Sequence, residues 1–171
     1  MKQIHCDLFL MWPPGAGGNF LLSLYTWGSI GAIPVKNDLN SYDAEPFPSV
    51  AQIDTMEDED KINKVDVICT HFPNDNYVNN YNFKCDNAWA VTVDEIDTWN
   101  YITKLANIKQ SVQSIPSENQ LNRYSDLIEK MRYKIDNLQL LKYNDIFVNR
   151  TVFTSWTESL KSYHEKNLQL A

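Results

Sequence analysis

The sequence predicts an α/β fold, organised as a single three-layer α/β/α domain over residues 1–171 with a mostly parallel sheet. Short apolar runs rich in β-branched residues alternate along the chain with longer segments in which apolar residues recur every three or four positions. A length of 171 residues, 43% of them hydrophobic, suits one globular domain with a sizeable core. The first apolar run leads directly into a glycine-rich turn, which is typical of a strand-to-helix connection in such a sheet.

The first predicted strand covers residues 8–12, Leu-Phe-Leu-Met-Trp. Such a continuous apolar run fits a strand that is buried on both faces, as in a parallel sheet covered by helices. Pro13 and Pro14 then end the strand pairing, and the glycines that follow allow close backbone approach that a Cβ atom would prevent. The next segment predicts a helix, because its apolar residues recur at helical spacing: Phe20, Leu21, Leu24 and Trp27.

The glycine turn consists of Gly15, Ala16, Gly17, Gly18 and Asn19. A turn of this kind at a helix start directs several backbone N–H groups and the positive end of the helix dipole at one point, which predicts a site for phosphate or sulfate. The alternative is a tight connection without a ligand. The nucleotide-triphosphate signature ends in Gly-Lys-Ser/Thr, and here Asn19 follows Gly18, so an ordinary ATPase or GTPase is disfavoured.

The segments that follow this helix carry weaker patterns. Residues 33–35 predict a short strand, and residues 37–49 predict a loop whose length is typical of loops that frame a site. Residues 50–64 predict a weak acidic helix. The acidic bias is concentrated from Asp54 to Asp60, and its run Glu57-Asp58-Glu59-Asp60 is interpreted as a solvated helix or loop rather than as a metal site.

The middle of the chain predicts two further strands. Residues 65–70 are apolar and β-branched, so they predict a strand, and His71 follows directly at its carboxyl end. Residues 74–82 predict a helical turn or loop, and residues 88–93 predict a third buried strand. A helix is expected from Asp94 to about residue 112, because apolar residues mark one face of this segment.

The last third of the chain predicts two helices and one strand. Ser117 and Gln120 resemble a capping box, and the helix expected over residues 117–138 carries an apolar stripe with steps of three and four. The stripe consists of Leu121, Tyr124, Ile128, Met131, Ile135 and Leu138. Residues 140–143 predict the last strand, and residues 153–163 predict a closing amphipathic helix.

Charge, cysteine content and hydropathy exclude several classes of function. The net charge of −7 disfavours a nucleic-acid partner, because a broad surface would lack the cations to neutralise a phosphate backbone. Three cysteines, an odd number without a close pair in the sequence, suggest neither a disulfide framework nor a zinc site. No apolar run is long enough to cross a bilayer. We therefore expect a cytoplasmic protein without a membrane partner and without a metal.

His71 is the candidate catalytic residue. Ligands of open α/β sheets bind beyond the carboxyl ends of the strands, which is where the glycine turn, His71 and Asp94 are expected. A histidine there could act as general base for a hydroxyl nucleophile, because its pKa lies near the operating pH. The alternative is a histidine that only satisfies nearby backbone groups.

Three segments resemble the sulfotransferase family. Pro-Gly-Ala-Gly-Gly-Asn-Phe-Leu at residues 14–21 resembles the family's 5′-phosphosulfate loop, Pro-Lys-Ser-Gly-Thr-Thr-Trp-Leu. Thr-His-Phe-Pro at residues 70–73 resembles the family's Lys-Thr-His-Leu-Pro segment, whose histidine deprotonates the acceptor. Tyr-Asn-Asp-Ile-Phe at residues 143–147 resembles a late Tyr-Glu-Asp-Leu segment that is a structural landmark. The three matches occur in the family's order and cover about a tenth of the chain directly.

The resemblance implies a P-loop nucleotide-binding fold, with 3′-phosphoadenylyl sulfate as the donor and an unidentified hydroxyl compound as the acceptor. It implies that Gly15, Ala16, Gly17, Gly18 and Asn19 hold the donor and that His71 is the base. The family's loop lysine falls on Gly15, and Val93-Asp94-Glu95 stands where the family carries an arginine. Two alternatives therefore stay open: a non-catalytic binding or assembly protein of P-loop fold, and a divergent phosphotransferase with Asp94 or Glu95 as base or indirect magnesium ligand. The oligomeric state is left open.

Overall fold

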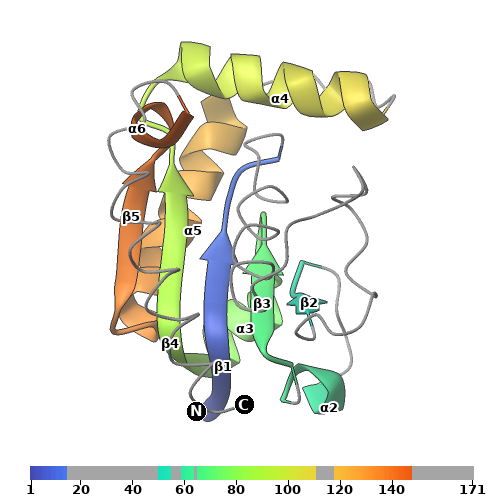
Figure 1. The fold of residues 1–171 in the computed structure, drawn as a ribbon, viewed down its shortest axis with the longest axis vertical. Coiled ribbons are helices and arrows are strands. Elements are labelled where there is room, and N and C mark those ends of the chain that lie inside the picture. Colours follow the sequence, from blue (N-terminus) through green and yellow to red (C-terminus); the bar gives the residue numbers. More distant parts are fainter. Residues whose placement is uncertain (15–49, 55–58, 64, 111–117, 148–171) are drawn as a thin grey trace, which may run out of the picture.

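The computed structural model describes residues 1–14, 50–54, 59–63, 65–110 and 118–147, shown in colour in Figure 1. The elements within these ranges follow in chain order: β1 (Lys2–Met11), β2 (Val50–Gln52), α2 (Glu59–Ile62), β3 (Val67–Thr70), α3 (Asp75–Asn80), β4 (Tyr81–Thr92), α4 (Ile96–Gln110), α5 (Glu118–Lys134), β5 (Leu138–Lys142) and α6 (Tyr143–Phe147).

The described strands form one parallel sheet in the order β2-β3-β1-β4-β5. This sheet confirms the predicted α/β class. The strand that follows β1 in the sequence is β2, which lies on the far side of β3 at one edge of the sheet. The later strands β3, β4 and β5 lie successively closer to the opposite edge. Such a reversal of direction is a topological switch point, and ligands of open parallel sheets bind beyond the carboxyl ends of the strands at this position. In this sheet the switch point is the carboxyl end of β1.

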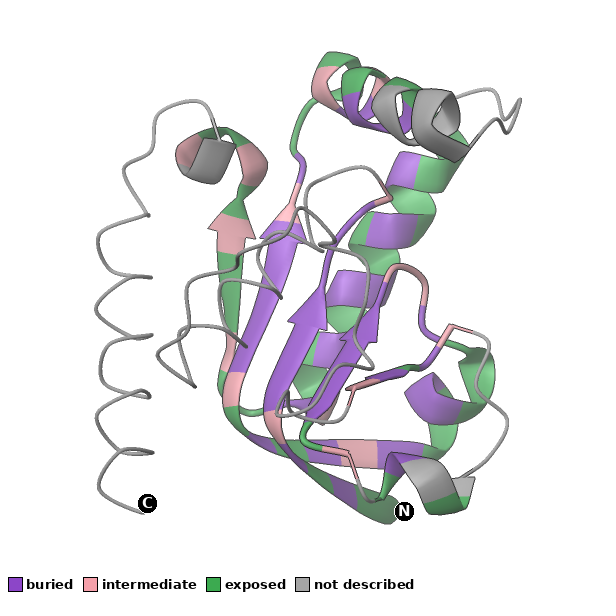
Figure 2. Cartoon of the chain, turned by 45° about the vertical axis from the view of Figure 1, so that its right-hand side comes forward, coloured by how far each residue is buried: buried purple, intermediate pink, exposed green. Residues whose placement is uncertain are grey.

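The core is built around β1, the central strand. Its carboxyl half, from Leu8 to Met11, is fully buried, as predicted from the continuous apolar run. Figure 2 shows buried residues along the carboxyl halves of the central strands. Helices α3 and α5 contact each other and β4, so they cover the same face of the sheet. The side chains of α5 buried there are Leu121, Tyr124, Leu127, Ile128 and Met131.

Helix α4 lies across the carboxyl ends of the strands rather than along the sheet (Figure 1). Trp99 of α4 is fully buried, with its ring centroid 5.6 Å from that of Tyr124 on α5. The Tyr124 hydroxyl donates a buried hydrogen bond of 2.7 Å to the backbone oxygen of Val91 near the end of β4. These contacts connect α4, α5 and β4 at the edge of the sheet where a ligand is expected.

The structure corrects the prediction of an acidic helix over residues 50–64. Its first residues form β2, in which Val50 and Ala51 pair with Val67 and Ile68 of β3, and the described helix α2 covers Glu59–Ile62. Pairing with a distant strand therefore overrides the local preference for helix.

Several element boundaries also differ from the prediction: β1 begins at Lys2 rather than at residue 8, and β5 covers Leu138–Lys142 rather than residues 140–143. β4 begins at Tyr81 rather than at residue 88, because its amino half alternates buried and more exposed residues instead of forming a continuous apolar run. Helix α5 ends at Lys134, so Leu138 belongs to β5 rather than to the helical stripe.

Several predicted elements lie outside the described residues. They are the helix that begins at Phe20, the strand at 33–35, the loop at 37–49, the cap at Ser117 and the closing helix at 153–163. The second helical layer of the predicted three-layer arrangement depends on these segments, so it stays a prediction.

Candidate functional site

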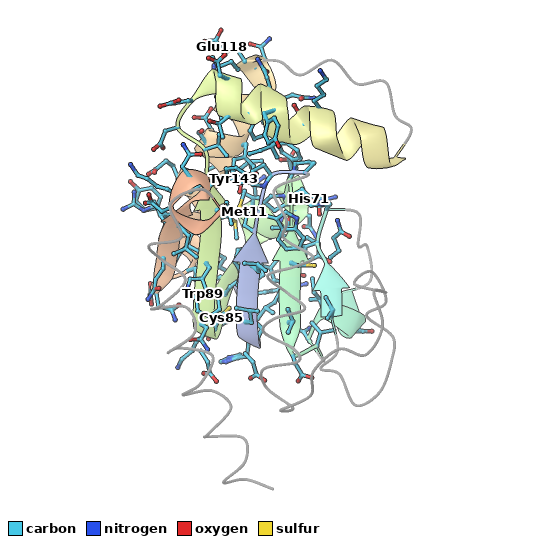
Figure 3. All side chains as sticks on the ribbon, turned by 45° about the horizontal axis from the view of Figure 1, so that its top comes forward. Met11, His71, Cys85, Trp89, Glu118 and Tyr143 are labelled. Atoms are coloured by element: carbon cyan, nitrogen blue, oxygen red, sulfur yellow. The ribbon has the colours of Figure 1, made fainter. Side chains whose placement is uncertain are left out.

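The carboxyl ends of β1 and β3 bring Trp12 and His71 together. Met11 and Thr70, the last residues of the two strands, are register partners, and the Trp12 amide donates a hydrogen bond of 3.1 Å to the Thr70 oxygen. The residues that follow therefore begin side by side. Figure 3 shows His71 close to the end of β1 that Met11 marks. The candidate site thus lies at the switch point of the sheet.

The His71 ring is held in one orientation by Trp12. Its Nδ1 lies 2.9 Å from the Trp12 backbone oxygen, and the ring meets the Trp12 indole edge-on, with centroids 5.0 Å apart at an interplanar angle of 86°. The ring is half-buried, so it is neither locked in the core nor freely rotating in solvent. Trp12 stands three residues before Gly15 in the sequence. The His71 side chain therefore contacts the segment that leads into the glycine turn.

This contact also fixes which nitrogen of neutral His71 carries the proton. A carbonyl oxygen can only accept a hydrogen bond, so Nδ1 must be the donor. The lone pair then lies on Nε2, which has no hydrogen-bond partner among the residues the structure describes. In this tautomer Nε2 can accept a proton, which is what a general base must do.

Asp54 fixes the backbone that carries His71. Its carboxylate accepts hydrogen bonds from the Thr70 hydroxyl at 2.9 Å, from the His71 amide at 3.1 Å and from the Phe72 amide. The Gln52 side-chain amide donates a further hydrogen bond of 2.8 Å. Thr70 is fully buried, so its hydroxyl has no access to water as a substitute partner. Asp54 thereby ties the end of β3 to the segment after β2.

From the sequence, Asp54 is only the first residue of the acidic stretch, and its anchoring role was not predicted. In the structure Ala51 and Ile53 are buried and Gln52 is exposed, so Asp54 closely follows a short strand at the ligand-binding edge of the sheet. A strand of three residues is too short to show this alternation as a period in the sequence.

Arg123 brings a positive charge to the residue next to His71. Its guanidinium carbon lies 5.3 Å from the centroid of the Phe72 ring, which itself meets Tyr124 edge-on at 5.9 Å. The stacking of a guanidinium on an aromatic face is attractive, and it restrains the exposed Arg123 side chain. No pattern in the sequence relates Arg123 to Phe72, because the contact depends on how α5 packs against the end of β3.

Asp94 lies at the same edge of the sheet but not beside His71. It follows β4, which is separated from β3 by β1, so the two strand ends are about 10 Å apart. The Asp94 carboxylate pairs with the Lys142 ammonium at 3.1 Å, and this hydrogen bond raises the pKa of Lys142. Both side chains are exposed, so the pair contributes little to stability. The cavity beside it measures about 50 Å³, far below the size of pockets that enclose a small-molecule ligand.

The remaining predicted site residues, Gly15, Ala16, Gly17, Gly18 and Asn19, lie outside the described residues. Whether they adjoin His71 therefore stays a prediction from the sequence. Within the described ranges, no helix has the length and apolar character needed to cross a membrane. Among the described residues, no group of three or more His, Cys, Asp or Glu side chains is arranged so that it could hold a metal ion.

The fold and the site define a parallel α/β protein with a restrained, half-buried histidine at the switch point of its sheet. Comparison of the chain with protein-family models, with curated proteins and with solved structures found no match. The function is therefore argued from the site itself.

Proposed function

We propose that this protein is a sulfotransferase-like enzyme that binds a 3′-phosphoadenylyl sulfate-type donor and transfers the sulfuryl group to a hydroxyl acceptor. The observation that carries the proposal is the orientation of His71 beside the carboxyl end of β1. The bond from Nδ1 to the Trp12 oxygen leaves the lone pair on Nε2, and the half-buried ring lies at the switch point. This arrangement supports a role for His71 as general base.

In the proposed reaction, Nε2 of His71 takes the proton of the acceptor hydroxyl as its oxygen attacks the sulfur atom. The bond between sulfur and the bridging oxygen of the donor breaks, and adenosine 3′,5′-bisphosphate leaves. The imidazolium that forms keeps its Nδ1–H bond to the Trp12 oxygen, which holds the ring in place during transfer. The hydrogen bonds from His71 and Phe72 to Asp54 keep the supporting backbone rigid.

The donor would be held by backbone N–H groups of Gly15, Ala16, Gly17, Gly18 and Asn19, as the resemblance to the family implies. The family's loop lysine is missing, so another cation must stabilise the negative charge on the leaving phosphate. Arg123, stacked on Phe72, is the candidate. The pairing of Asp94 with Lys142 lowers the repulsion that the Asp94 carboxylate would otherwise exert on a donor phosphate.

A non-catalytic binding or assembly protein is the second candidate function. The specific observation in its favour is that a histidine that merely stabilises a turn makes the same bond from Nδ1 to a backbone oxygen. A phosphotransferase receives less support, because the Asp94 carboxylate is paired with Lys142. Asp94 also follows β4, which is separated by β1 from the strand that His71 follows.

One experiment distinguishes the sulfotransferase-like enzyme from the non-catalytic binding or assembly protein. The chain is incubated with 3′-phosphoadenylyl sulfate and a panel of phenolic and aliphatic alcohols, and release of adenosine 3′,5′-bisphosphate is measured. We expect His71→Ala to lower turnover by about 10²- to 10⁴-fold, with an unchanged affinity for the bisphosphate product. The matched control is His5→Ala, because His5 is exposed on the amino half of β1. Bisphosphate binding without turnover by the parent chain, or equal turnover by both variants, would contradict catalysis by His71.

A further inference from the structure

Two cysteines that are far apart in the sequence lie opposite each other in the sheet. Cys6 of β1 is the register partner of Cys85 of β4, so the two side chains project from the same face of the sheet. Neighbouring strands lie about 4.8 Å apart, which falls within the Cα separation that a disulfide spans. Cys69, the third cysteine, lies on β3 opposite Leu10, four residues further along β1. Cys6 and Cys85 therefore form a dithiol pair that excludes Cys69.

Among the described residues, Cys85 borders a cavity whose wall does not include Cys6. The cavity measures about 390 Å³, and its wall also includes Lys84, Lys134 and Asn137. The Asn137 side-chain amide donates a hydrogen bond of 2.9 Å to the Cys85 backbone oxygen, which anchors this part of β4. Figure 3 shows Cys85 toward the amino end of the sheet, away from His71. The pair is therefore separate from the candidate site described above.

We propose that Cys6 and Cys85 are an oxidation site that a small hydroperoxide converts into a cross-strand disulfide. The peroxide enters through the cavity and oxidises Cys85 to a sulfenic acid, with release of water. The Cys6 sulfur then attacks the oxidised sulfur, a disulfide bond forms, and the sulfenic oxygen leaves as a second water that carries the Cys6 proton. The dithiol loses two electrons and one peroxide is reduced. A small thiol such as dithiothreitol or glutathione restores the pair by exchange.

The environment assigns different roles to the two sulfurs. The neighbouring Cys85 side chain and burial in the core raise the pKa of the Cys6 thiol, so Cys6 keeps its proton at neutral pH. The two thiols are equally buried, so the cavity decides which of them meets a solvent-borne oxidant first, and its wall includes Cys85 but not Cys6. Cys6 acts as the resolving thiol, because the register of the two strands places it beside Cys85 when the latter is oxidised. The chemistry of this pair does not depend on the proposed transferase activity.

Hydrogen peroxide treatment of the folded, unmutated chain tests the proposal. After treatment the protein is unfolded, its free thiols are alkylated, and a digest made without reduction is analysed by mass spectrometry. We expect one peptide pair joined through Cys6 and Cys85, alkylated Cys69, and a fall from three free thiols to one. Dithiothreitol should restore all three thiols.

Matched variants separate this pair from general oxidation. Cys69→Ala should keep the Cys6–Cys85 link, whereas Cys6→Ala should leave Cys85 with an unresolved single-sulfur oxidation product. Cys85→Ala should leave Cys6 unmodified, because Cys6 does not border the cavity. Two outcomes would overturn the proposal: both thiols stay alkylatable after peroxide treatment, or the link forms only in denaturant and includes Cys69 as often as the other two.

Discussion

Replacement of Asp54 by alanine should destabilise the protein far more than its partly exposed position suggests. The Asp54 carboxylate accepts hydrogen bonds from the Thr70 hydroxyl and from the backbone amides of His71 and Phe72. Asp54→Ala leaves these donors without a protein acceptor, and the Thr70 hydroxyl is fully buried. Each unsatisfied buried donor costs about 1–3 kcal/mol, so we expect a loss of roughly 3–5 kcal/mol. That loss is a large share of the total free energy of unfolding of a typical domain, which is about 5–15 kcal/mol.

Urea unfolding at neutral pH measures this loss as a lower transition midpoint at an unchanged slope. Asp54→Asn keeps one acceptor oxygen but directs an amide group at the remaining donors, so its cost should be about half that of Asp54→Ala. Asp126→Ala is the control, because Asp126 is exposed on α5; its effect should stay within about 0.5 kcal/mol. If Asp54→Ala matched Asp126→Ala, the carboxylate would not hold the end of β3.

Three further predictions concern the core. Tyr124→Phe removes the buried hydrogen bond to Val91 and should lower the free energy of unfolding in urea by about 1–2 kcal/mol. Tyr133→Phe is the control, because Tyr133 is exposed, and it should leave the free energy of unfolding almost unchanged. Equal losses in the two variants would refute the role of this bond. Ile128→Asp should lower the free energy of unfolding by roughly 3 kcal/mol or more, because it buries an unpaired carboxylate. A melting temperature within a degree or two of that of the unmutated protein would show that the wrong face of α5 was assigned to the core. Burial raises the pKa of Cys69 from 9.0 to about 12. The unfolded chain therefore loses this proton first, so stability should fall as pH rises from 9 to 12 by up to about 1.4 kcal/mol per unit, and Cys69→Ala should flatten the decline.

The parts of the fold that the sequence predicted are those in which the local pattern and the tertiary environment agree. The carboxyl half of β1 is apolar because both faces are covered, and α5 carries one stripe because one face is covered. β2 was missed because three residues are too few to show a period. Its existence depends on pairing with β3, which local sequence does not encode.

The same distinction applies to the site. His71 could be placed at a strand end from the run before it, and the structure agrees. Three other features of the site join residues that are distant in the sequence: the contact of His71 with Trp12, its anchoring by Asp54 and the stacking of Arg123 on Phe72. Contacts of this range follow from strand order and helix packing, so no local pattern predicts them.

Calorimetric titration of the full chain with adenosine 3′,5′-bisphosphate tests the central claim most directly, because this compound is the product that the proposed transfer would release. We expect binding in the micromolar range, equivalent to about −8 kcal/mol, and weaker binding of adenosine 5′-monophosphate, which lacks the 3′-phosphate. The absence of any binding heat at millimolar bisphosphate would contradict the proposed function.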